Sequence, residues 1–143
     1  MYKKILVPTD GSEYALRAEE HALYLAKVSG AEIIAVSVIE NNFVSTLPLD
    51  NEIYELTSLL KKDSEKNIQE FEDLNEKEHD DVKITPIIKE GSPAKEILQT
   101  AQEEDVDLIV IGSSGKSGFD RFLMGSVADK VVKSAKCSVF VVH

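Results

Sequence analysis

Five short strand-like segments, four of them almost entirely apolar and all separated by helix-like patterns, most constrain what this chain can fold into. The segments lie at residues 5–7, 33–39, 82–89, 108–111 and 138–142. Unbroken apolar strands that alternate with helices are typical of a parallel sheet covered on both faces. Right-handed crossovers turn such a chain into a doubly wound layer. The pattern therefore predicts an α/β fold: a doubly wound five-stranded parallel sheet with helices on both faces, Rossmann-like, in a single domain of residues 1–143.

Local signals place the helices between these strands. Ser12 is positioned to cap the first helix, and Gly30 is a predicted left-handed cap at its end. Ser92 and Pro93 are predicted to open the third helix as its cap and first residue, and the fourth begins near Ser126. The inner face of the first helix is predicted to carry Ala15, Ala18, Ala22, Leu25 and Ala26.

The second helix, predicted over residues 51–78, is long and strongly acidic. Residues 50–81 carry 12 of the 26 acidic residues but only 4 of the 16 basic ones. A solvated helix face is the interpretation we prefer for these acids. Ser64 is a weak point in the apolar stripe of this helix.

Charge and composition exclude several classes of partner. The net charge is −10, which argues against a nucleic-acid partner because backbone binding needs clustered Lys and Arg. No apolar segment approaches the roughly 20 residues of a membrane helix, and the apolar run at the N-terminus is too short for a signal peptide. We therefore expect a cytoplasmic protein without a membrane partner.

Metal and disulfide chemistry also lack a basis in the sequence. Cys137 is the single cysteine, so no intramolecular disulfide can form. His21, His79 and His143 lie far apart in the sequence, whereas metal sites come as clusters. These histidines are expected to be surface or packing residues.

A glycine-rich turn follows the fourth strand and is the strongest functional signal. Four of the seven glycines fall within residues 112–125. Glycines let a backbone approach a ligand closely and adopt positive φ, and successive N–H groups can then bind an anion. Ligands of doubly wound sheets bind beyond the carboxyl ends of the strands, so the turn is predicted to bind phosphate or a nucleotide. The alternative is a loop whose glycines serve turn geometry alone.

The turn does not match the common phosphate-binding motifs. A Walker A loop needs a glycine where this chain has Val110, and the dinucleotide fingerprint is absent after the first strand. Instead, Gly112-x-x-Gly115, nine residues, and then Gly125-Ser126 resembles the ATP-binding signature of the universal stress protein family. The opening Lys4-Ile-Leu-Val-Pro-Thr-Asp-Gly-Ser12 and the later Gly91-x-Pro93 and Met124-Gly-Ser-Val127 resemble that family too, so the resemblance covers nearly the whole chain.

The resemblance implies a role for each matching residue. Asp10 would contact the ribose or the phosphate-bound metal, and the Val38 backbone would contact the adenine edge. ATP would carry Mg²⁺ or Mn²⁺ on its phosphates. Pro8 and Thr9 would line the pocket, Gly112, Ser113, Gly115 and Lys116 would surround the ribose and phosphates, and Gly125, Ser126 and Val127 would hold the phosphates. Asp10 as a turn former and Lys116 as a solvated loop charge are the simpler alternatives.

Two residues depart from the family pattern. Ser114 stands where many relatives have histidine, which removes one candidate for acid–base chemistry. Ser138 stands where the last strand usually begins with proline. The sequence contains no convincing catalytic set, because no base is recognisable beside a nucleophile.

We therefore expect an ATP-binding regulatory protein in which the nucleotide acts as a switch, with an unidentified signalling partner. A weak ATPase or nucleotide-transferring enzyme is the first alternative, and a partner-binding module that ignores nucleotide is the second. The last strand, from Val139 to Val142, is apolar and would pair with its copy in a homodimer if it lies at the sheet edge. Pro86 indicates that the third strand lies at an edge or contains an irregularity.

Overall fold

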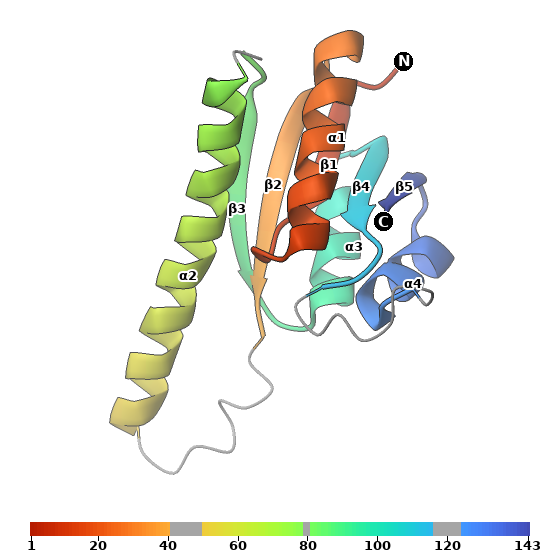
Figure 1. Cartoon of the computed structure of the whole chain (residues 1–143). Helices are drawn as coiled ribbons and strands as arrows, with labels where there is room; N and C mark the ends of the chain where they lie inside the picture. The colour runs from red at the N-terminus through yellow and green to blue at the C-terminus, as the bar shows by residue number, and fades with distance from the viewer. Residues whose placement is uncertain (41–49, 79–80, 116–123) are drawn as a thin grey trace.

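The computed structural model describes residues 1–40, 50–78, 81–115 and 124–143. Strands and helices alternate along the chain (Figure 1). Their order is β1 (Lys4–Pro8), α1 (Glu13–Ser29), β2 (Glu32–Ile39), α2 (Asp50–Lys77), β3 (Ile84–Glu90), α3 (Pro93–Glu103), β4 (Leu108–Gly112), α4 (Ser126–Ser134) and β5 (Ser138–Val142). The predicted order of elements is confirmed, and each predicted strand differs from the observed one by at most two residues at either end.

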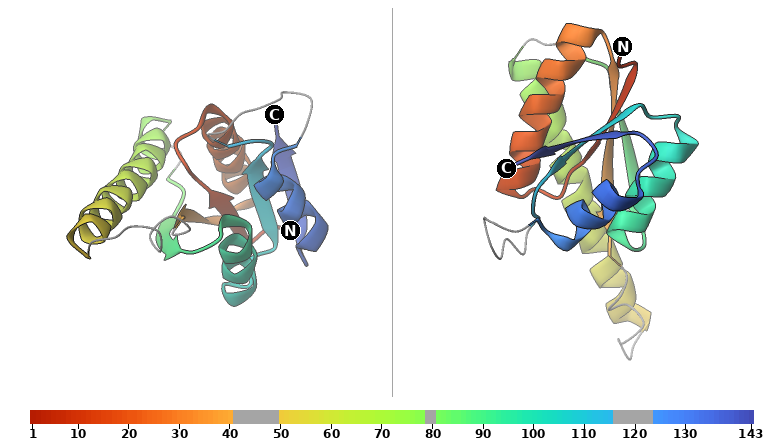
Figure 2. Two further views of the ribbon diagram at one scale, coloured as in Figure 1. Left: turned by 90° about the horizontal axis from the view of Figure 1, so that it is seen from below. Right: turned by 90° about the vertical axis from the view of Figure 1, so that its right-hand side faces the viewer.

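The five strands form one parallel sheet in the order β3-β2-β1-β4-β5. Figure 2 shows the helices divided between the two sides of the sheet. One core cluster joins α1 and Phe71 of α2 to one face, and the other joins α3 and α4 to the opposite face. The predicted doubly wound α/β fold is therefore confirmed. Chain order reverses at β1, where the crossovers change direction.

The local signals of the sequence explain where these elements begin and end. The Ser12 hydroxyl accepts a hydrogen bond from the Ala15 N–H at 3.1 Å, as predicted for the cap of α1. Gly30 ends that helix with a φ of 78°. Ser92 occupies the predicted cap position of α3, but its side chain makes no capping hydrogen bond. Pro86 lies in the edge strand β3, where the missing N–H costs no ladder hydrogen bond.

Two details of the helix faces go beyond the sequence pattern. Leu25 packs half-buried against the core, as its predicted place on the inner face implies, and α1 also buries Leu23 and the carboxylate residue Glu19, which were not predicted. Ser64 is no weak point in α2, because it is buried and its Oγ accepts a hydrogen bond from the Ser37 hydroxyl at 2.9 Å. The hydroxyl groups of Ser37 on β2 and Ser64 on α2 are paired with each other. The stripe of α2 therefore makes a buried hydrogen bond at this position instead of an apolar contact.

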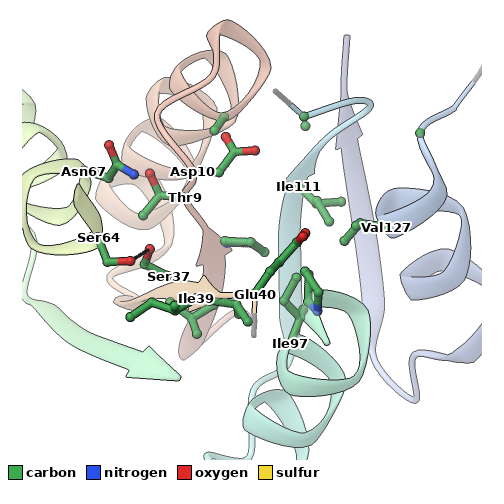
Figure 3. Close-up of a pocket in the computed structure, with 18 of the residues that line it drawn as sticks. Thr9, Asp10, Ser37, Ile39, Glu40, Ser64, Asn67, Ile97, Ile111 and Val127 are labelled. Carbon is green, nitrogen blue, oxygen red and sulfur yellow. Dashed lines mark hydrogen bonds between the residues drawn. The ribbon is translucent and has the colours of Figure 1, made fainter. Parts of the chain in front are cut away.

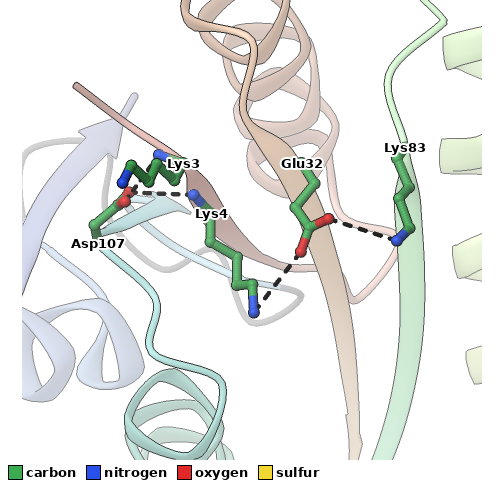
Figure 4. A network of polar contacts seen from close by, with 5 residues as sticks. All are labelled: Lys3, Lys4, Glu32, Lys83 and Asp107. Carbon is green, nitrogen blue, oxygen red and sulfur yellow. Dashed lines mark hydrogen bonds and ion pairs between the residues drawn. The ribbon is translucent and has the colours of Figure 1, made fainter.

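Polar contacts join the strands at their amino ends (Figure 4). The Asp107 carboxylate accepts from the backbone N–H groups of Lys3 at 2.8 Å and Lys4 at 3.4 Å. Glu32 pairs with the ammonium groups of Lys4 at 3.7 Å and Lys83 at 3.6 Å. Charged side chains therefore connect four strands at the amino ends of the sheet. No helix in the described part of the chain is long and apolar enough to cross a membrane.

Candidate functional site

The site lies where β1 and β4 separate. These neighbouring strands are paired only at Ile5–Leu108 and Leu6–Ile109, so their carboxyl-terminal halves diverge. A pocket of about 540 Å³ opens beyond them (Figure 3), a volume within the usual range for small-molecule sites. It receives side chains from both faces of the sheet, and it lies where ligands bind in doubly wound folds.

The structure brings most of the predicted site residues to this pocket. Its lining includes Pro8, Thr9, Asp10, Val38, Gly112, Gly115, Gly125, Ser126 and Val127. Ser113 is buried and is not among the lining residues. Lys116 lies outside the described residues.

Ser113 connects the two ends of the glycine-rich turn. Its N–H donates to the Val142 carbonyl at 2.7 Å, and its own carbonyl accepts from the Gly125 N–H at 2.7 Å. The backbone of β4 is thereby tied to β5 on one side and to the start of α4 on the other. We conclude that Ser113 positions the segments that line the pocket.

Close approach explains the described glycines of this turn, Gly112, Gly115 and Gly125, and positive φ does not. None of the three described glycines in the turn has a positive φ, so that part of the prediction was wrong. A Cβ on Gly112 would lie 2.8 Å from backbone atoms of Tyr14 in α1. Gly125 is the N-cap of α4 and brings no side chain to cap the helix. The N–H groups of the first turn of α4 are consequently open to a ligand.

Asp10 serves both as a turn residue and as part of the pocket. Its Oδ1 accepts from the Ser12 N–H at 2.9 Å, which is the geometry of an Asx turn. Its Oδ2 would lie 2.9 Å from a Cβ on Gly115. The carboxylate therefore reaches across the gap between β1 and β4 to the glycine-rich turn.

The backbone of Val38 is directed into the same gap. The Val36 carbonyl accepts from the Thr9 N–H at 2.8 Å, and β1 is paired with β2 only as far as Val36. Residues two apart in a strand direct their N–H and C=O groups to the same side. The backbone groups of Val38 therefore face the side of β2 on which β1 has already ended.

Sequence reasoning missed the α2 wall of the pocket. This wall and the adjoining end of β2 contribute Ser37, Glu40, Asp63, Ser64 and Asn67. The opposite wall is apolar and includes Ile97 of α3 and Ile111 of β4, and Figure 3 places them across the pocket from Ser64 and Asn67. Two polar residues within the apolar stripe of α2, Ser64 and Asn67, were the available signal.

A buried carboxyl group lies directly beneath the pocket. Glu19 is only 3% exposed, and its Oε1 accepts a hydrogen bond from the Thr9 hydroxyl at 2.5 Å. Burial raises the pKa of Glu19 to about 7, against the opposing effect of the Thr9 hydrogen bond. The carboxylates of Glu70, Asp10 and Glu20 raise it further. No base was predicted beside a nucleophile, whereas the folded chain places the Glu19 carboxyl group against the Thr9 hydroxyl.

The raised pKa of Glu19 predicts a stability that falls as the pH rises. The folded protein holds the Glu19 proton up to about pH 7, whereas the unfolded chain releases it near pH 4.5, the ordinary pKa of a glutamate. The proton on Glu19 contributes about 3 kcal/mol to the free energy of unfolding below pH 4.5. This contribution is lost as the pH rises through 7. In urea unfolding between pH 5 and pH 8, E19Q should lack this decline because the amide does not ionise. If the free energy of unfolding of the wild type and of E19Q changes in parallel between pH 5 and pH 8, the raised pKa of Glu19 is contradicted.

The described residues offer no group of three or more His, Cys, Asp or Glu side chains that could hold a metal ion by themselves. His21 and His143 are exposed, as expected for surface residues, and His79 lies outside the described ranges.

Comparisons with known proteins show a family and a fold for this chain. A sequence profile of the universal stress protein family matches residues 1–143. Universal stress protein MJ0531 of Methanocaldococcus jannaschii is 39% identical over 142 residues, which cover 99% of this chain and 82% of that protein. The solved structure of the protein MJ0577, from the same organism, is similar with a TM-score of 0.88 and 34% identity, covering 99% of this chain and 96% of that one. A universal stress protein solved in complex with cAMP has a TM-score of 0.65 and 25% identity, with 99% and 97% covered.

Proposed function

Because the chain belongs to the universal stress protein family, we propose that it binds ATP in this pocket and uses the nucleotide as a conformational switch. The observation that most supports the proposal is the division of the pocket into chemically different parts. An apolar wall suits a base, and the backbone-lined glycine turn beside the first turn of α4 suits phosphates. A relative that was solved with cAMP adds support for an adenine nucleotide.

The proposed pose follows from these parts. The adenine packs against Ile97 and Ile111, and its edge meets the open backbone groups of Val38. The phosphates lie over Gly115 and the open N–H groups at the start of α4, where the positive end of the helix dipole favours anions. Ser126 and Val127 belong to that first turn, and Lys116 is proposed to approach the same phosphates.

Mg²⁺ or Mn²⁺ fits this arrangement. Magnesium sites in nucleotide-binding proteins typically use one or two carboxylates together with substrate phosphates. Asp10 supplies one carboxylate beside Gly115, next to the proposed phosphate position. The cation would neutralise phosphate charge, and Asp10 would hold it in place.

The switch is proposed to act through the glycine-rich turn. The Ser113 carbonyl and the Gly125 N–H join the two ends of this turn, so a ligand that contacts Gly115 and Ser126 touches both of its arms. Binding then favours one arrangement of the turn, which a signalling partner distinguishes. A ligand shifts such an equilibrium only by its difference in affinity for the two states.

A weak phosphoryl-transfer activity is the second candidate function, and the Thr9–Glu19 pair favours it. Thr9 lines the pocket, and its hydroxyl donates to a carboxyl group with a pKa of about 7, which is suited to a general base. Single-turnover assays with radiolabelled ATP test this. Product formed by the wild type and absent in E19Q would favour an enzyme, whereas no product above the buffer control over hours would exclude this candidate.

A homodimer through β5 is also proposed. β5 lies at the edge of the sheet, and Phe140 is 42% exposed there. Unpaired N–H and C=O groups at such an edge can pair with a second copy around a twofold axis. Light scattering at micromolar concentration should give the mass of a dimer, and a monomer would contradict the proposal.

The nucleotide that accompanies the protein during purification gives the first test of binding. A denaturing extract of freshly purified protein should contain ATP when analysed by chromatography and mass spectrometry. Added ATP with magnesium should also raise the melting temperature, because it binds only the native state. An extract without nucleotide, together with an unchanged melting temperature, would favour the nucleotide-independent partner-binding module.

A further inference from the structure

Asn67 is a buried polar residue that the proposed pose has not used. It lies on α2, it is only 9% exposed, and it lines the pocket. Its amide has no hydrogen-bond partner among the residues that the structure describes. No fully buried side-chain polar atom of these residues lacks a partner, so the Asn67 amide must reach the open volume of the pocket. A buried amide of this kind is expected to hydrogen-bond to a ligand or to water.

Asn75, eight residues further along the same helix, provides a contrast. Its amide nitrogen donates to the Val82 carbonyl at 2.8 Å, and its amide oxygen accepts from the Val82 N–H at 3.4 Å. Asn75 thus joins α2 to the start of the β3 segment. One asparagine of α2 serves the fold, and the other presents its amide to the pocket.

The turn between β1 and α1 places Asn67 next to Asp10. A Cβ on Gly11 would lie 2.6 Å from the Asn67 Oδ1, so the amide packs closely against this turn. Asp10 precedes Gly11, and its Oδ2 faces Gly115 on the other side. Figure 3 shows Asn67, Thr9 and Asp10 on the same side of the pocket. Asp10 therefore lies between the Asn67 amide and the glycine-rich turn.

Charge and polarity identify the part of a nucleotide that meets Asn67. Asp63 lies one turn before Asn67 on α2 and lines the pocket, and its carboxylate disfavours phosphates at this wall. The apolar surface that suits the base lies on the opposite wall, at Ile97 and Ile111. A neutral group rich in hydroxyls remains, and in a nucleotide that group is the ribose, which connects base and phosphates.

We propose that Asn67 and Asp10 together bind the 2′- and 3′-hydroxyls of the ribose, and that they make the site selective for ribonucleotides. The Asp10 Oδ1 accepts from one hydroxyl with the lone pair that the Ser12 N–H does not use, which leaves Oδ2 for the cation, and the Asn67 amide donates to or accepts from the other hydroxyl. A site built around such hydrogen bonds rejects an analogue that lacks the hydroxyl, because buried polar groups are left unpaired. This inference rests on the proposed binding of ATP.

Calorimetric titration with ATP, 2′-deoxy-ATP and 3′-deoxy-ATP tests the inference. The wild type should bind each deoxy analogue about 10-fold more weakly than ATP, the usual value of one hydrogen bond. In N67L, ATP should bind about 10-fold more weakly, and the discrimination against one of the two analogues should disappear. Because the Asn67 amide has no protein partner, N67L should keep the melting temperature of the wild type, and N67A provides a smaller substitution for the same test.

N75L is the matched control. It should lower the melting temperature, because it removes two hydrogen bonds within the protein, and it should leave the ATP-to-deoxy-ATP ratios unchanged. If N67L and N67A bind all three nucleotides with wild-type ratios, the role of Asn67 is overturned while ATP binding stands. If the wild type binds none of them, the proposed function and the inference fail together.

Discussion

Replacing Gly112 with alanine should destabilise the protein by about 3 kcal/mol, which corresponds to a fall in melting temperature of about 10 °C. The added Cβ would lie 2.8 Å from the carbonyl carbon, the oxygen and the Cβ of Tyr14. Two of these atoms belong to the backbone of α1, which cannot move away as a side-chain tip can. The helix and β4 must therefore separate, and core contacts on both sides are lost.

Gly30→Ala is the matched control for this prediction. Gly30 has a φ of 78°, and a Cβ there meets no atom within 4 Å. Its replacement therefore costs only the backbone strain of a left-handed residue, about 1 kcal/mol. Urea unfolding of both variants measures the difference. Equal losses would mean that close packing against α1 is not the reason for the glycine at position 112.

Replacing Gly115 with valine should abolish most ATP binding and leave the fold intact. A Cβ at this position would lie 2.9 Å from the Asp10 Oδ2, and no other atom of the described residues lies within 4 Å. The carboxylate is the end of a flexible side chain, so it can turn away at little cost to stability. Valine then fills the proposed phosphate position and displaces Asp10. The dissociation constant for ATP should rise about 100-fold, equivalent to about 2.7 kcal/mol.

Two measurements separate this effect from unfolding. The melting temperature of Gly115→Val without ligand should remain close to that of the wild type, and Gly30→Ala should bind ATP normally because it lies far from the pocket. The double replacement of Gly115 and Gly125 by valine should remove binding altogether. A double variant that still bound ATP normally would contradict the assignment of the site.

Features of the fold that depend on neighbouring residues were predictable from the sequence. The Ser12 cap and the Gly30 cap each follow from the preference of one residue for one backbone geometry. Pro86 indicated an edge strand because proline lacks the N–H that a central strand needs. The turns after β1 and β4 were predictable as pocket walls, since the carboxyl ends of parallel strands meet at one edge.

Features that depend on tertiary packing were not predictable in this way. The reason for Gly112 is the position of Tyr14, which is almost 100 residues away in the sequence. Glu19 resembles any surface acid of an amphipathic helix until α1 is packed over Thr9. Ser64 and Asn67 interrupt an apolar stripe, and only the contact between α2 and the end of β2 gives them a place in the pocket.

Calorimetric titration of ATP with magnesium into nucleotide-free wild-type protein tests the central claim most directly. The account predicts saturable binding at one site per chain, and binding that is lost in Gly115→Val but retained in Gly30→Ala. Absence of binding to a folded wild-type protein, or equal binding by all three proteins, would contradict it.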